Sequence, residues 1–538
     1  MSVKDAKHIV LVPMIMWGHT RPMCTLAARL VKLRNVIVTM FMSGAFAERV
    51  RAEIVKDFEP GEEALLARIT LVPLHQSNSP FDSASYEADF LDVWAQFMGG
   101  RPLGGYAVDG TPRIVDPSEK DRLSGAIVDM FAIRAFRELH GLKERLGMKV
   151  FTLFPAAASC LFFWFGEDRV KEAEELAART NVSFNAAAHE LLIVSKGELV
   201  KSPCLPLMYD YEYHPQSVDF PPDFAGNVLI HVNRCLREAD GMITIDAAEY
   251  HPPTTAVVRA WFAPRPAYFA GPLVPRTAGT EGVLDADQSA VEVTRFLDAR
   301  LQSHGERSVM LISYGSMFWP ADSAKVGAVL DVLMDQGIPF VSVASPVTRD
   351  LTLIHGCAVW DDIGDDDDDG QVLSRCSPRS SIPDETASRL EAYDGAFVAK
   401  WVPQQAVLAH PATGWCITHA GHNSVLECIT SNVPMILWPI DADQAANAIH
   451  LAEELRVAYE LVEVRHGAGL GTVHRTGRTP RGTVEAVKSE IRDVLARAFG
   501  GDGEEKRARL GLLRSELQAA WAEGGVARRE VEAFLDSL

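Results

Sequence analysis

The segment from Trp401 to Gln444 constrains the fold of this chain more than any other part of the sequence. An apolar run, Gly414–His419, has the length of a buried strand, and an Ala-Gly turn follows it directly. The residues after the turn have a helical composition and include Ser424 and Glu427. A strand, a Gly-containing turn and a helix in this order are typical of a parallel α/β unit.

Strand-length apolar runs and helical patterns alternate along the rest of the chain, which indicates an α/β fold with parallel sheets. Because the chain has 538 residues, it is too long for a single core, and we expect two or three domains. A helix is expected at Ser289–Leu301 and a strand at Val309–Ser313. The strands expected in the first half are His8–Met14, Val36–Phe41, Ala126–Asp129, Lys149–Pro155, Gly241–Asp246 and Tyr268–Gly271.

The Ala-Gly turn has the properties of a binding site for a diphosphate. The first N–H groups of a helix have no partner within it, and the positive end of the helix dipole adds to their attraction for anions. Gly421 allows close approach of a ligand to the backbone, while His419 and Ser424 offer side-chain donors. Glu427 can accept hydrogen bonds from a ribose, and Trp401 offers a flat face to a pyrimidine base. Ser424 and Glu427 also fit an ordinary capping box, so a purely structural role stays open.

A second candidate site follows the expected strand at His8–Met14. His19 falls beyond the carboxyl end of this strand, where ligands bind in open α/β sheets. A His can act as a general base near neutral pH, particularly when a carboxylate holds its other ring nitrogen. Asp129, at the end of another apolar run, can supply that carboxylate from a neighbouring loop. A single loop His is more often an ordinary surface residue, so this alternative also stays open.

Together these motifs resemble the signature of the family 1 UDP-glycosyltransferases, inverting enzymes that glycosylate small lipophilic acceptors. The family pattern W-x-P-Q matches Trp401–Gln404, and H-x-G-x-N-S-x-x-E matches His419–Glu427. The pairs V-P and D/E-Q follow at Val433–Pro434 and Asp443–Gln444, and the catalytic loop G-H-x-x-P matches Gly18–Pro22. The resemblance implies the GT-B architecture, in which two doubly wound Rossmann-like domains face a central cleft.

The same resemblance implies how a UDP-sugar is bound. Gln444 is the family residue usually found with glucose donors, so UDP-glucose is the expected donor. His422 stands where plant members usually carry Trp, in a position that shapes the sugar pocket. The implied donor contacts are Trp401 to uracil, Gln404 and Glu427 to ribose, His419, Asn423, Ser424 and Ser316 to phosphate, and Asp443 and Gln444 to the sugar hydroxyls, with Val402 and Gly421 beside them.

The pattern V-D-x-F at Val128–Phe131 resembles the strand that bears the family's catalytic Asp. The resemblance therefore implies that His19 takes a proton from an acceptor hydroxyl and that Asp129 holds the tautomer of the ring. One direct displacement inverts the anomeric centre, so an α-linked donor gives a β-glycoside. We expect no cofactor and no metal, because the start of the helix after His419 stabilises the leaving UDP.

The acceptor is the part of the function about which the sequence says least. Family members build their acceptor pocket in the region that corresponds to Ser77–Gly110. Its aromatic residues can line an apolar cleft, but a helix packed on the core gives the same composition. We expect a hydrophobic hydroxylated acceptor, such as a phenolic, terpenoid, sterol or lipid. The acceptor-binding residues expected on this basis are Phe81, Tyr86, Phe90 and Trp94.

Three other functions fit parts of the pattern. A non-catalytic nucleotide-sugar-binding subunit would keep the C-terminal motif but would not need His19 and Asp129. A sterol or lipid glycosyltransferase shares the chemistry but needs a surface that contacts a membrane. A nucleotide-sugar epimerase uses a related two-domain fold with a different set of acids and bases.

The expected domain organisation follows the two motif regions. An N-terminal acceptor-binding domain at 1–270 precedes a linker at 271–288 and a C-terminal UDP-sugar-binding domain at 289–510. A final helix in 511–538 is expected to pack back on the first domain. The Asp-rich segment 346–382 reads as a disordered insertion, because its like charges repel one another. The basic, Gly-containing segment 465–481 is expected to be a mobile loop.

Composition restricts the partners and the compartment. A net charge of −20 argues against binding to nucleic acid or to an anionic membrane. The eight cysteines lack metal-ligand spacing and are typical of reduced thiols in a cytosolic protein. We find no signal peptide and no stretch that predicts a transmembrane segment. The protein is therefore expected to be cytoplasmic, as a monomer or weak dimer.

Overall fold

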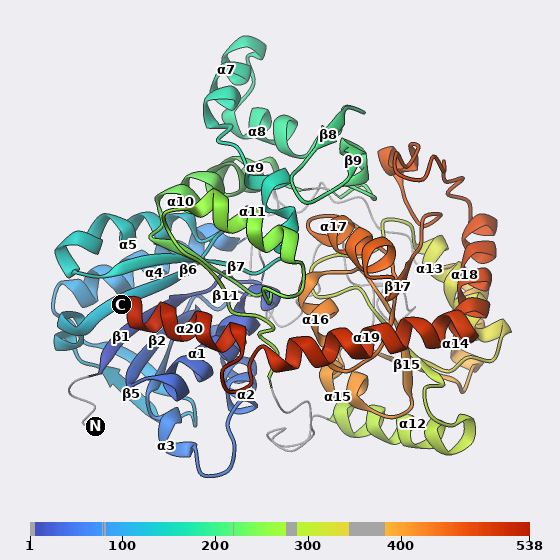
Figure 1. Ribbon diagram of the computed structural model, residues 1–538, viewed down its shortest axis with the longest axis horizontal. Helices are drawn as coiled ribbons and strands as arrows, with labels where there is room; N and C mark the ends of the chain where they lie inside the picture. The colour runs from blue at the N-terminus through green and yellow to red at the C-terminus, as the bar shows by residue number, and fades with distance from the viewer. Residues whose placement is uncertain (1–5, 78, 80–81, 219, 276–287, 344–381) are drawn as a thin grey trace, which may run out of the picture.

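The chain folds into two lobes, each built on a β-sheet that is covered by helices (Figure 1). The computed structural model describes residues 6–77, 79, 82–218, 220–275, 288–343 and 382–538. We call the lobe around the N-terminal sheet the first lobe and the other the second lobe. The strands of the first sheet are β1 (Lys7–Val12), β2 (Val36–Ser43), β3 (Ile69–Leu74), β4 (Leu103–Ala107), β5 (Pro112–Val115), β6 (Leu123–Asp129), β7 (Lys149–Phe154), β10 (Gly241–Thr244) and β11 (Ala267–Phe269).

These strands lie in the order β11-β10-β7-β6-β1-β2-β3-β4-β5. The neighbours from β11 to β3 are parallel, and β4 and β5 extend the edge in antiparallel pairs. The second sheet is entirely parallel, in the order β14-β13-β12-β15-β16-β17. Its strands are β12 (Val309–Ser313), β13 (Phe340–Val343), β14 (Ala396–Ala399), β15 (Thr413–Thr418), β16 (Met435–Leu437) and β17 (Ala458–Glu460).

Both sheets contain a topological switch point, where the chain leaves two neighbouring strands in opposite directions. In the first sheet the switch lies between β1 and β6, and in the second sheet between β12 and β15. Ligands bind outside the carboxyl ends of strands at such points, because the loops diverge and leave a crevice. The fold therefore places one crevice in each lobe, and the two sequence motifs follow these strands.

Helices cover both sheets, and amphipathic helices of this kind bury one face against the strands. The helices of the first lobe are α1 (Trp17–Leu33), α2 (Ala47–Val55), α3 (Glu63–Leu66), α4 (Ser83–Met98), α5 (Ile133–Leu146), α6 (Leu161–Phe165), α7 (Val170–Thr180), α8 (Phe184–Leu192), α9 (Pro222–Asn227), α10 (Val232–Glu238) and α11 (Pro252–Phe262). A hairpin of β8 (Leu199–Lys201) and β9 (Leu207–Tyr209) follows α8.

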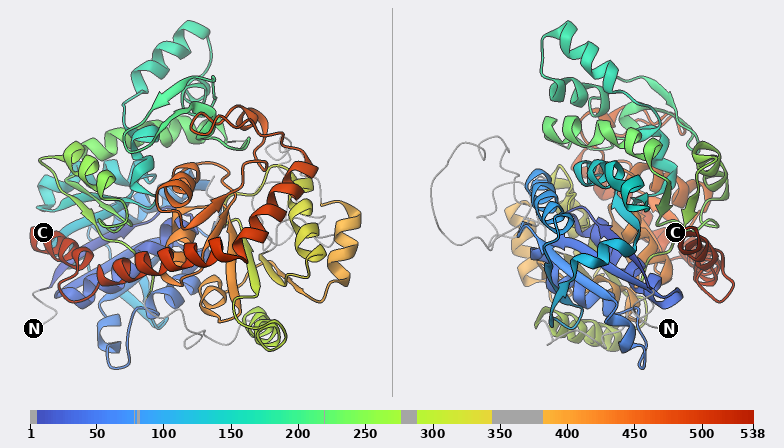
Figure 2. Two further views of the ribbon diagram at one scale, coloured as in Figure 1. Left: turned by 45° about the vertical axis from the view of Figure 1, so that its right-hand side comes forward. Right: turned by 90° about the vertical axis from the view of Figure 1, so that its left-hand side faces the viewer.

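The second lobe begins with α12 and ends with a long helix that leads back to the first lobe. Its helices are α12 (Gln288–His304), α13 (Ser323–Asp335), α14 (Asp384–Ala392), α15 (Gln404–Ala409), α16 (His422–Thr430), α17 (Gln444–Ile449), α18 (Val484–Ala498) and α19 (Gly501–Ala519). The last helix, α20 (Val526–Ser537), packs against β11 and α1 (Figures 1 and 2). There the ring centroid of Phe534 lies 5.0 Å from that of Phe151, in the core of the first lobe.

The expected α/β class with two doubly wound sheets is confirmed, and most strand predictions are correct within two or three residues. The strand predicted at Val309–Ser313 is β12 itself, and the predicted helix at Ser289–Leu301 forms α12. Apart from Ile382, the Asp-rich segment 346–382 lies outside the described residues, as does most of the expected linker. In the described ranges, each helix is too short or too polar to cross a bilayer.

The expectation of a mobile loop at 465–481 is wrong. Arg475 in this segment is largely buried and pairs with Glu212 of the first lobe at 3.1 Å and with Glu453 and Glu460 of the second lobe. These carboxylates and hydrogen bonds raise the pKa of Arg475 despite its burial, so the guanidinium stays charged. The segment is therefore held between the lobes by ion pairs to residues distant in sequence.

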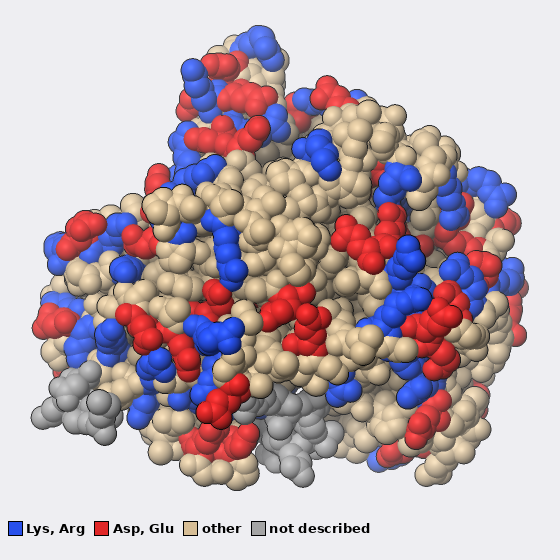
Figure 3. Space-filling view, in the orientation of Figure 1, with Lys and Arg blue, Asp and Glu red and all other residues tan. Residues whose placement is uncertain are grey.

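On the face of the molecule that Figure 3 shows, the acidic side chains do not gather into one large patch. Figure 3 shows acidic and basic side chains mixed over one face of the molecule, including the projecting region around α7. Mixed charge of this kind produces no single extended field for a polyanion.

Candidate active site

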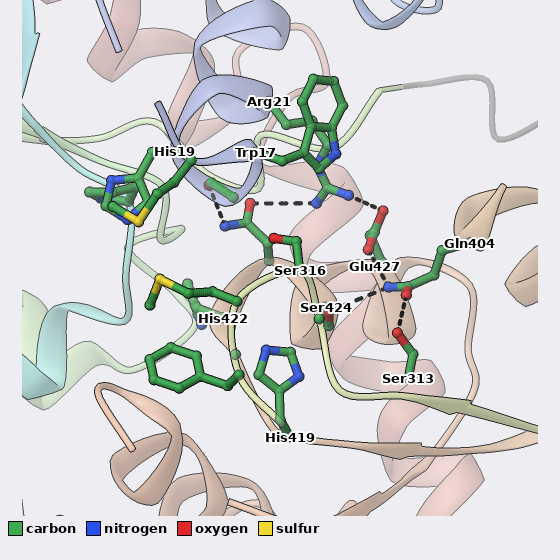
Figure 4. A pocket seen from close by; sticks show the side chains of 18 of the residues that line it. Trp17, His19, Arg21, Ser313, Ser316, Gln404, His419, His422, Ser424 and Glu427 are labelled. Carbon is green, nitrogen blue, oxygen red and sulfur yellow. Dashed lines mark hydrogen bonds and ion pairs between the residues drawn. The ribbon is translucent and has the colours of Figure 1, made fainter. Parts of the chain in front are cut away.

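A cavity of about 1000 Å³ lies between the carboxyl ends of the two sheets, and residues of both lobes line it. The loops after β1 and β6 contribute from the first lobe, and those after β12 and β15 contribute from the second. Both switch points therefore open into one shared space, and Figure 4 looks into it. A cavity of this size can hold a nucleotide sugar together with a small second molecule.

His19 and Asp129 meet at the edge of this cavity. His19 lies in the first turn of α1, and its Nδ1 is 2.8 Å from Oδ2 of Asp129 at the end of β6. The Asp129 side chain is fully buried, and its Oδ1 accepts a hydrogen bond from the N–H of Phe131 at 2.9 Å. A carboxylate only accepts hydrogen bonds, so the imidazole carries its proton on Nδ1 and leaves the lone pair of Nε2 free for a ligand in the cavity.

The turn between β15 and α16 forms the opposite wall. α16 begins at His422, its N-cap is Gly421, and no side chain caps it. The capping box considered for Ser424 and Glu427 is therefore absent, because Ser424 is already inside the helix. Gly421, Asn423 and Ser424 line the cavity at this turn, so the first N–H groups of the helix, which have no partner within it, lie beside the cavity.

His419 packs against two glycines in this wall. A Cβ at Gly315 would lie 2.6 Å from His419 Nε2, and one at Gly421 would clash with the same atom. Gly315 also has a φ of +78°, which most L-residues avoid. Burial lowers the pKa of His419 to about 4, so its ring is neutral at neutral pH and can donate only one N–H. Ser316, next to Gly315, lines the same part of the cavity.

Four side chains next to this turn form a hydrogen-bond network. Gln404 Nε2 donates to Glu427 Oε2 at 2.8 Å and to Ser424 Oγ at 3.3 Å. Ser313, at the end of β12, donates through Oγ to Gln404 Oε1 at 2.7 Å. The network fixes the orientation of the Gln404 amide and of the Glu427 carboxylate, which are the polar groups expected at a ribose.

Two contacts join the lobes directly inside the cavity. Asn423 Nδ2 donates to the carbonyl oxygen of Gly18 at 2.7 Å, which ties the start of α16 to the residue before His19. Arg21, one helical turn beyond Gly18 on α1, forms an ion pair with Oε1 of Glu427, and the two side chains are only 9% and 2% exposed. Figure 4 shows Arg21 and Glu427 pointing toward each other across the cavity.

Asp443 and His422 belong to a buried polar cluster at another side of the cavity. Oδ2 of Asp443 accepts from Asn447 Nδ2 at 3.0 Å and from the His422 N–H at 3.3 Å. His422 Nε2 contacts Oδ1 of Asp246, which follows β10 of the first lobe. Burial disfavours the imidazolium, but the carboxylates of Asp246 and Asp443 raise the pKa of His422 above its ordinary value. Burial also raises the pKa of the Asp443 carboxyl.

The remaining donor-motif residues lie where they can contact a ligand. Trp401 is 44% exposed at the cavity rim, and its neighbour Val402 is buried beneath it. Gln444 also lines the cavity, but its Oε1 accepts hydrogen bonds from the N–H groups of Ile440 at 2.8 Å and Asp441 at 3.1 Å. Gln444 thus presents its amide NH₂ as the group available for hydrogen bonding.

The acceptor-lining prediction is wrong for three of its four residues, and Phe81 lies outside the described residues. Tyr86, Phe90 and Trp94 are 0%, 0% and 1% exposed in the core between α4 and the sheet. The hydroxyl group of Tyr86 donates a hydrogen bond to the backbone oxygen of Pro13 at 2.8 Å, so it is not available to a ligand. These aromatic residues follow helical spacing, so the core alternative is the correct one. The apolar wall near His19 is formed instead by Phe131, Trp164, Phe165, Ile193, Phe220 and Phe224.

Sequence reasoning missed Arg21, Ser313 and Asp246 at this site. Arg21 occupies one of the variable x positions of G-H-x-x-P. An Arg inside an otherwise apolar helical pattern could have indicated a functional residue. Asp246 lies at the end of a predicted strand. The same position at a strand end was the reason for selecting Asp129 as a site residue. Ser313 gave no such signal, because a Ser at a strand end is common.

Comparison with known proteins agrees with this geometry. The family model for UDP-glucoronosyl and UDP-glucosyl transferase matches residues 384–465. UDP-glycosyltransferase eriJ of Hericium erinaceus is 28% identical over 99% of this chain and 98% of its own length. UDP-glucose flavonoid 3-O-glucosyltransferase 6 of Fragaria ananassa is 22% identical over 100% and 99% of the two chains. The structure of Phytolacca americana UGT2, complexed with UDP-2fluoro-glucose and pterostilbene, covers 99% of each chain with 18% identity and a TM-score of 0.63.

Two doubly wound sheets that face one shared cavity define the GT-B class of proteins. Relatives that match along the whole chain, together with the family model over the motif segment, show that this chain is similar to the family 1 UDP-glycosyltransferases. These similarities support a glycosyltransferase enzyme.

Proposed function

We propose that the enzyme transfers glucose from UDP-glucose to a hydroxyl of a small hydrophobic acceptor and gives a β-glucoside. The observation that carries this proposal is the His19–Asp129 pair, which opens into the same cavity as the turn before α16. A base and an anion site on opposite walls of one cavity are the two elements that direct displacement at an anomeric carbon requires.

His19 acts as the general base. Its Nε2 lone pair accepts the proton of the acceptor hydroxyl while the oxygen attacks the anomeric carbon. Asp129 keeps the proton on Nδ1 and stabilises the imidazolium that forms, supported by its 2.8 Å contact with the ring. One displacement inverts the configuration, so the α-linked sugar of the donor becomes β-linked in the product.

The second lobe stabilises the departing UDP. The first N–H groups of α16 and a neutral His419 donate to the diphosphate, since burial lowers the pKa of His419 to about 4. Asn423 and Ser424 add side-chain donors, while Ser316 contributes from the loop after β12. These donors supply the stabilisation that a metal gives in other transferases, so we infer transfer without a catalytic metal and without a cofactor.

The ribose and the base bind on the same lobe. Glu427 and Gln404 accept and donate hydrogen bonds at the ribose, and Trp401 stacks on uracil at the cavity rim. Arg21 must release Oε1 of Glu427 when the ribose hydroxyls take that oxygen. The Arg21 guanidinium then lies between Glu427 and Asn423, and its Nη2 already donates to Oδ1 of Asn423 at 3.4 Å. From this position the guanidinium can turn to the diphosphate.

Glucose is the donor sugar that Asp443 and Gln444 favour. The Gln444 NH₂ and the open oxygen of Asp443 can bind neighbouring sugar hydroxyls. The name of the Fragaria enzyme includes UDP-glucose, and UDP-2fluoro-glucose accompanies the Phytolacca structure, which supports this choice.

The apolar wall selects the acceptor class. Phe131 lies 5.2 Å from the His19 ring, centroid to centroid, so an acceptor that packs on it presents its hydroxyl to the base. The relatives named for a flavonoid and solved with pterostilbene support a hydrophobic hydroxylated acceptor. The six described cysteines are free thiols, which supports action in the reducing cytoplasm.

The test is incubation of the enzyme with UDP-glucose and a panel of phenols, terpenoids and sterols, with products read by mass spectrometry. Addition of a hexose, with a β-anomeric coupling constant in the proton NMR spectrum, is the expected result. Donor hydrolysis or sugar interconversion without any transfer would argue for the epimerase alternative. Donor binding with neither reaction would leave only a nucleotide-sugar-binding protein.

A further inference from the structure

Three side chains of metal-ligand type meet at the interface between the lobes, outside the cavity described above. His251 directly precedes α11 of the first lobe, while His450 and Glu454 lie on a π-helical turn after α17 of the second lobe. One ligand atom of each residue lies within 4.8 Å of those of the other two. Single π-helical turns are often found at functional sites, because the widened turn redirects side chains.

One of the two contacts made by the Glu454 carboxylate has the length of a ligand–ligand distance in a tetrahedral metal site. Glu454 Oε2 is 3.4 Å from His251 Nε2 and 2.6 Å from His450 Nδ1. Zinc with bonds of about 2.0–2.1 Å places its ligand atoms about 3.3 Å apart. The first separation already has this length. The second requires a small rotation of the Glu454 side chain, which is 44% exposed.

The other ring nitrogen of each His is held by a fixed partner. His450 Nε2 lies 3.1 Å from the carbonyl oxygen of Tyr250, and His251 Nδ1 lies 2.7 Å from Oγ1 of Thr254. Metal-ligating histidines are oriented in this way, through a hydrogen bond from the nitrogen that does not bind the metal. These partners aim both free nitrogens at the Glu454 carboxylate.

The His450 ring lies between two oxygen atoms. Its Nε2 faces the carbonyl oxygen of Tyr250, and its Nδ1 faces Oε2 of Glu454. The ring of His251 stacks on that of His450 with centroids 4.2 Å apart. Both imidazoles therefore present a nitrogen to the same carboxylate.

We propose that His251 Nε2, His450 Nδ1 and a Glu454 carboxylate oxygen form a binding site for a zinc-class divalent cation that bridges the two lobes. Two imidazoles and one carboxylate are a ligand set that zinc prefers, with water in the fourth position. A cation placed between these ligand atoms can bind all three groups at once. The exposed Glu454 provides the path by which the ion reaches the buried ring of His450.

The site is coupled to the donor side of the cavity through one aromatic ring. The ring of Tyr250 packs edge-on against that of His450, with ring centroids 4.8 Å apart. It also contacts the ring of His422 in a tilted arrangement, with ring centroids 5.3 Å apart. His422 lines the cavity, but none of the three ligands does. The cation therefore joins the lobes behind the active site and takes no part in the transfer step. This inference does not depend on the proposed donor or acceptor.

The test uses the full chain, freed of metal by a chelator and then dialysed. Titration with Zn²⁺ by calorimetry should give saturable uptake of one equivalent. Titration with Co²⁺ should give the visible absorption of a tetrahedral complex. His450→Ala and Glu454→Gln should weaken Zn²⁺ binding by more than about 100-fold, and Thr254→Val by about 10-fold, as expected for loss of an outer partner.

His75 provides the matched control. Its ring nitrogens contact the carboxylates of Asp82 at 2.8 Å and Asp89 at 3.4 Å, but no second His joins them in the described part of the chain. His75→Ala should therefore leave Zn²⁺ uptake unchanged. Absence of saturable uptake, or uptake that Glu454→Gln retains at full affinity, overturns the proposal. Should His450→Ala fail to fold, the exposed Glu454→Gln and the isosteric Thr254→Val still decide the question.

Discussion

Arg21 and Glu427 form a buried ion pair that crosses from the helix of His19 to the helix that begins at His422. The pair joins the two lobes at the point where the ribose is expected. Each partner has a further role in the proposed function, because Glu427 also bonds Gln404 and Arg21 also reaches Asn423. The same contact therefore contributes to stability in the free enzyme and must rearrange when the donor binds.

Removal of one partner of this pair should destabilise the enzyme more than removal of both. Arg21→Met leaves a buried carboxylate without its cation, which costs about 3–5 kcal/mol. The double variant Arg21→Met/Glu427→Met has no unpaired charge, so its free energy of unfolding should lie above that of Arg21→Met. Urea denaturation of the two single variants and the double variant measures this cycle. Simple addition of the two single losses would contradict a direct interaction.

Mild acid should destabilise the protein through two buried histidines. Burial lowers the pKa of His8 and of His419 from 6.5 to about 4. Because the folded state has the lower pKa, the unfolded state binds protons first as the pH falls. The contribution of each ring to the free energy of unfolding is therefore fully present above about pH 6.5. It is lost progressively as the pH falls to about 4, and the loss amounts to about 3 kcal/mol for each ring.

The variant His8→Gln isolates this effect from catalysis. His8 lies at the start of β1 and bonds Thr39 at 2.9 Å, outside the cavity. Denaturation at pH 7 and at pH 4.5 should show a smaller loss for His8→Gln than for the native chain. An identical pH dependence of the two proteins would mean that His8 is not the buried neutral ring described here.

Asp246 should position His422 for the sugar of the donor. Asp246→Asn removes the charge that raises the pKa of His422 and weakens the contact between their side chains. A hydrogen bond to a charged group contributes about 1.5–3 kcal/mol, so the affinity for UDP-glucose should fall roughly 10- to 100-fold. The affinity for UDP, which lacks the sugar, should be almost unchanged. Calorimetry with both ligands decides this, and an equal loss for both would indicate a general structural effect.

Chelation should leave the transfer rate unchanged. The groups expected at the diphosphate are N–H donors and the Arg21 cation, and the candidate zinc ligands lie behind the cavity. The initial rate with and without EDTA should agree within about twofold, a difference of less than 0.5 kcal/mol in barrier. A large loss of rate that Mn²⁺ restores would show that the transfer needs a metal.

Local patterns were sufficient to predict the sheets, and the family resemblance then singled out the motif residues. Val309–Ser313 and the run that ends at Asp129 are short apolar segments next to turns, and such segments form parallel strands in most contexts. His19 and His419 follow strand ends, where the fold itself places ligands. These inferences need only the order of residues along the chain.

Contacts between distant segments could not be predicted in this way. Arg475 was assigned to a mobile loop because its partner Glu212 lies far away in sequence, and burial of the pair is visible only in the folded chain. Trp94 and its neighbours have a composition that suits a pocket or a core equally well, and only the packing of α4 separates the two. The group of His251 and His450 likewise exists only where the lobes meet.

The central claim is that His19 is the general base of the transfer, and His19→Ala measured under saturating donor tests it most directly. Loss of a positioned base should lower kcat by about 10²- to 10⁴-fold. The Kd for UDP should stay within about twofold, because His19 is not among the groups expected at the diphosphate. Turnover close to that of the native enzyme, with UDP binding intact, would contradict the account.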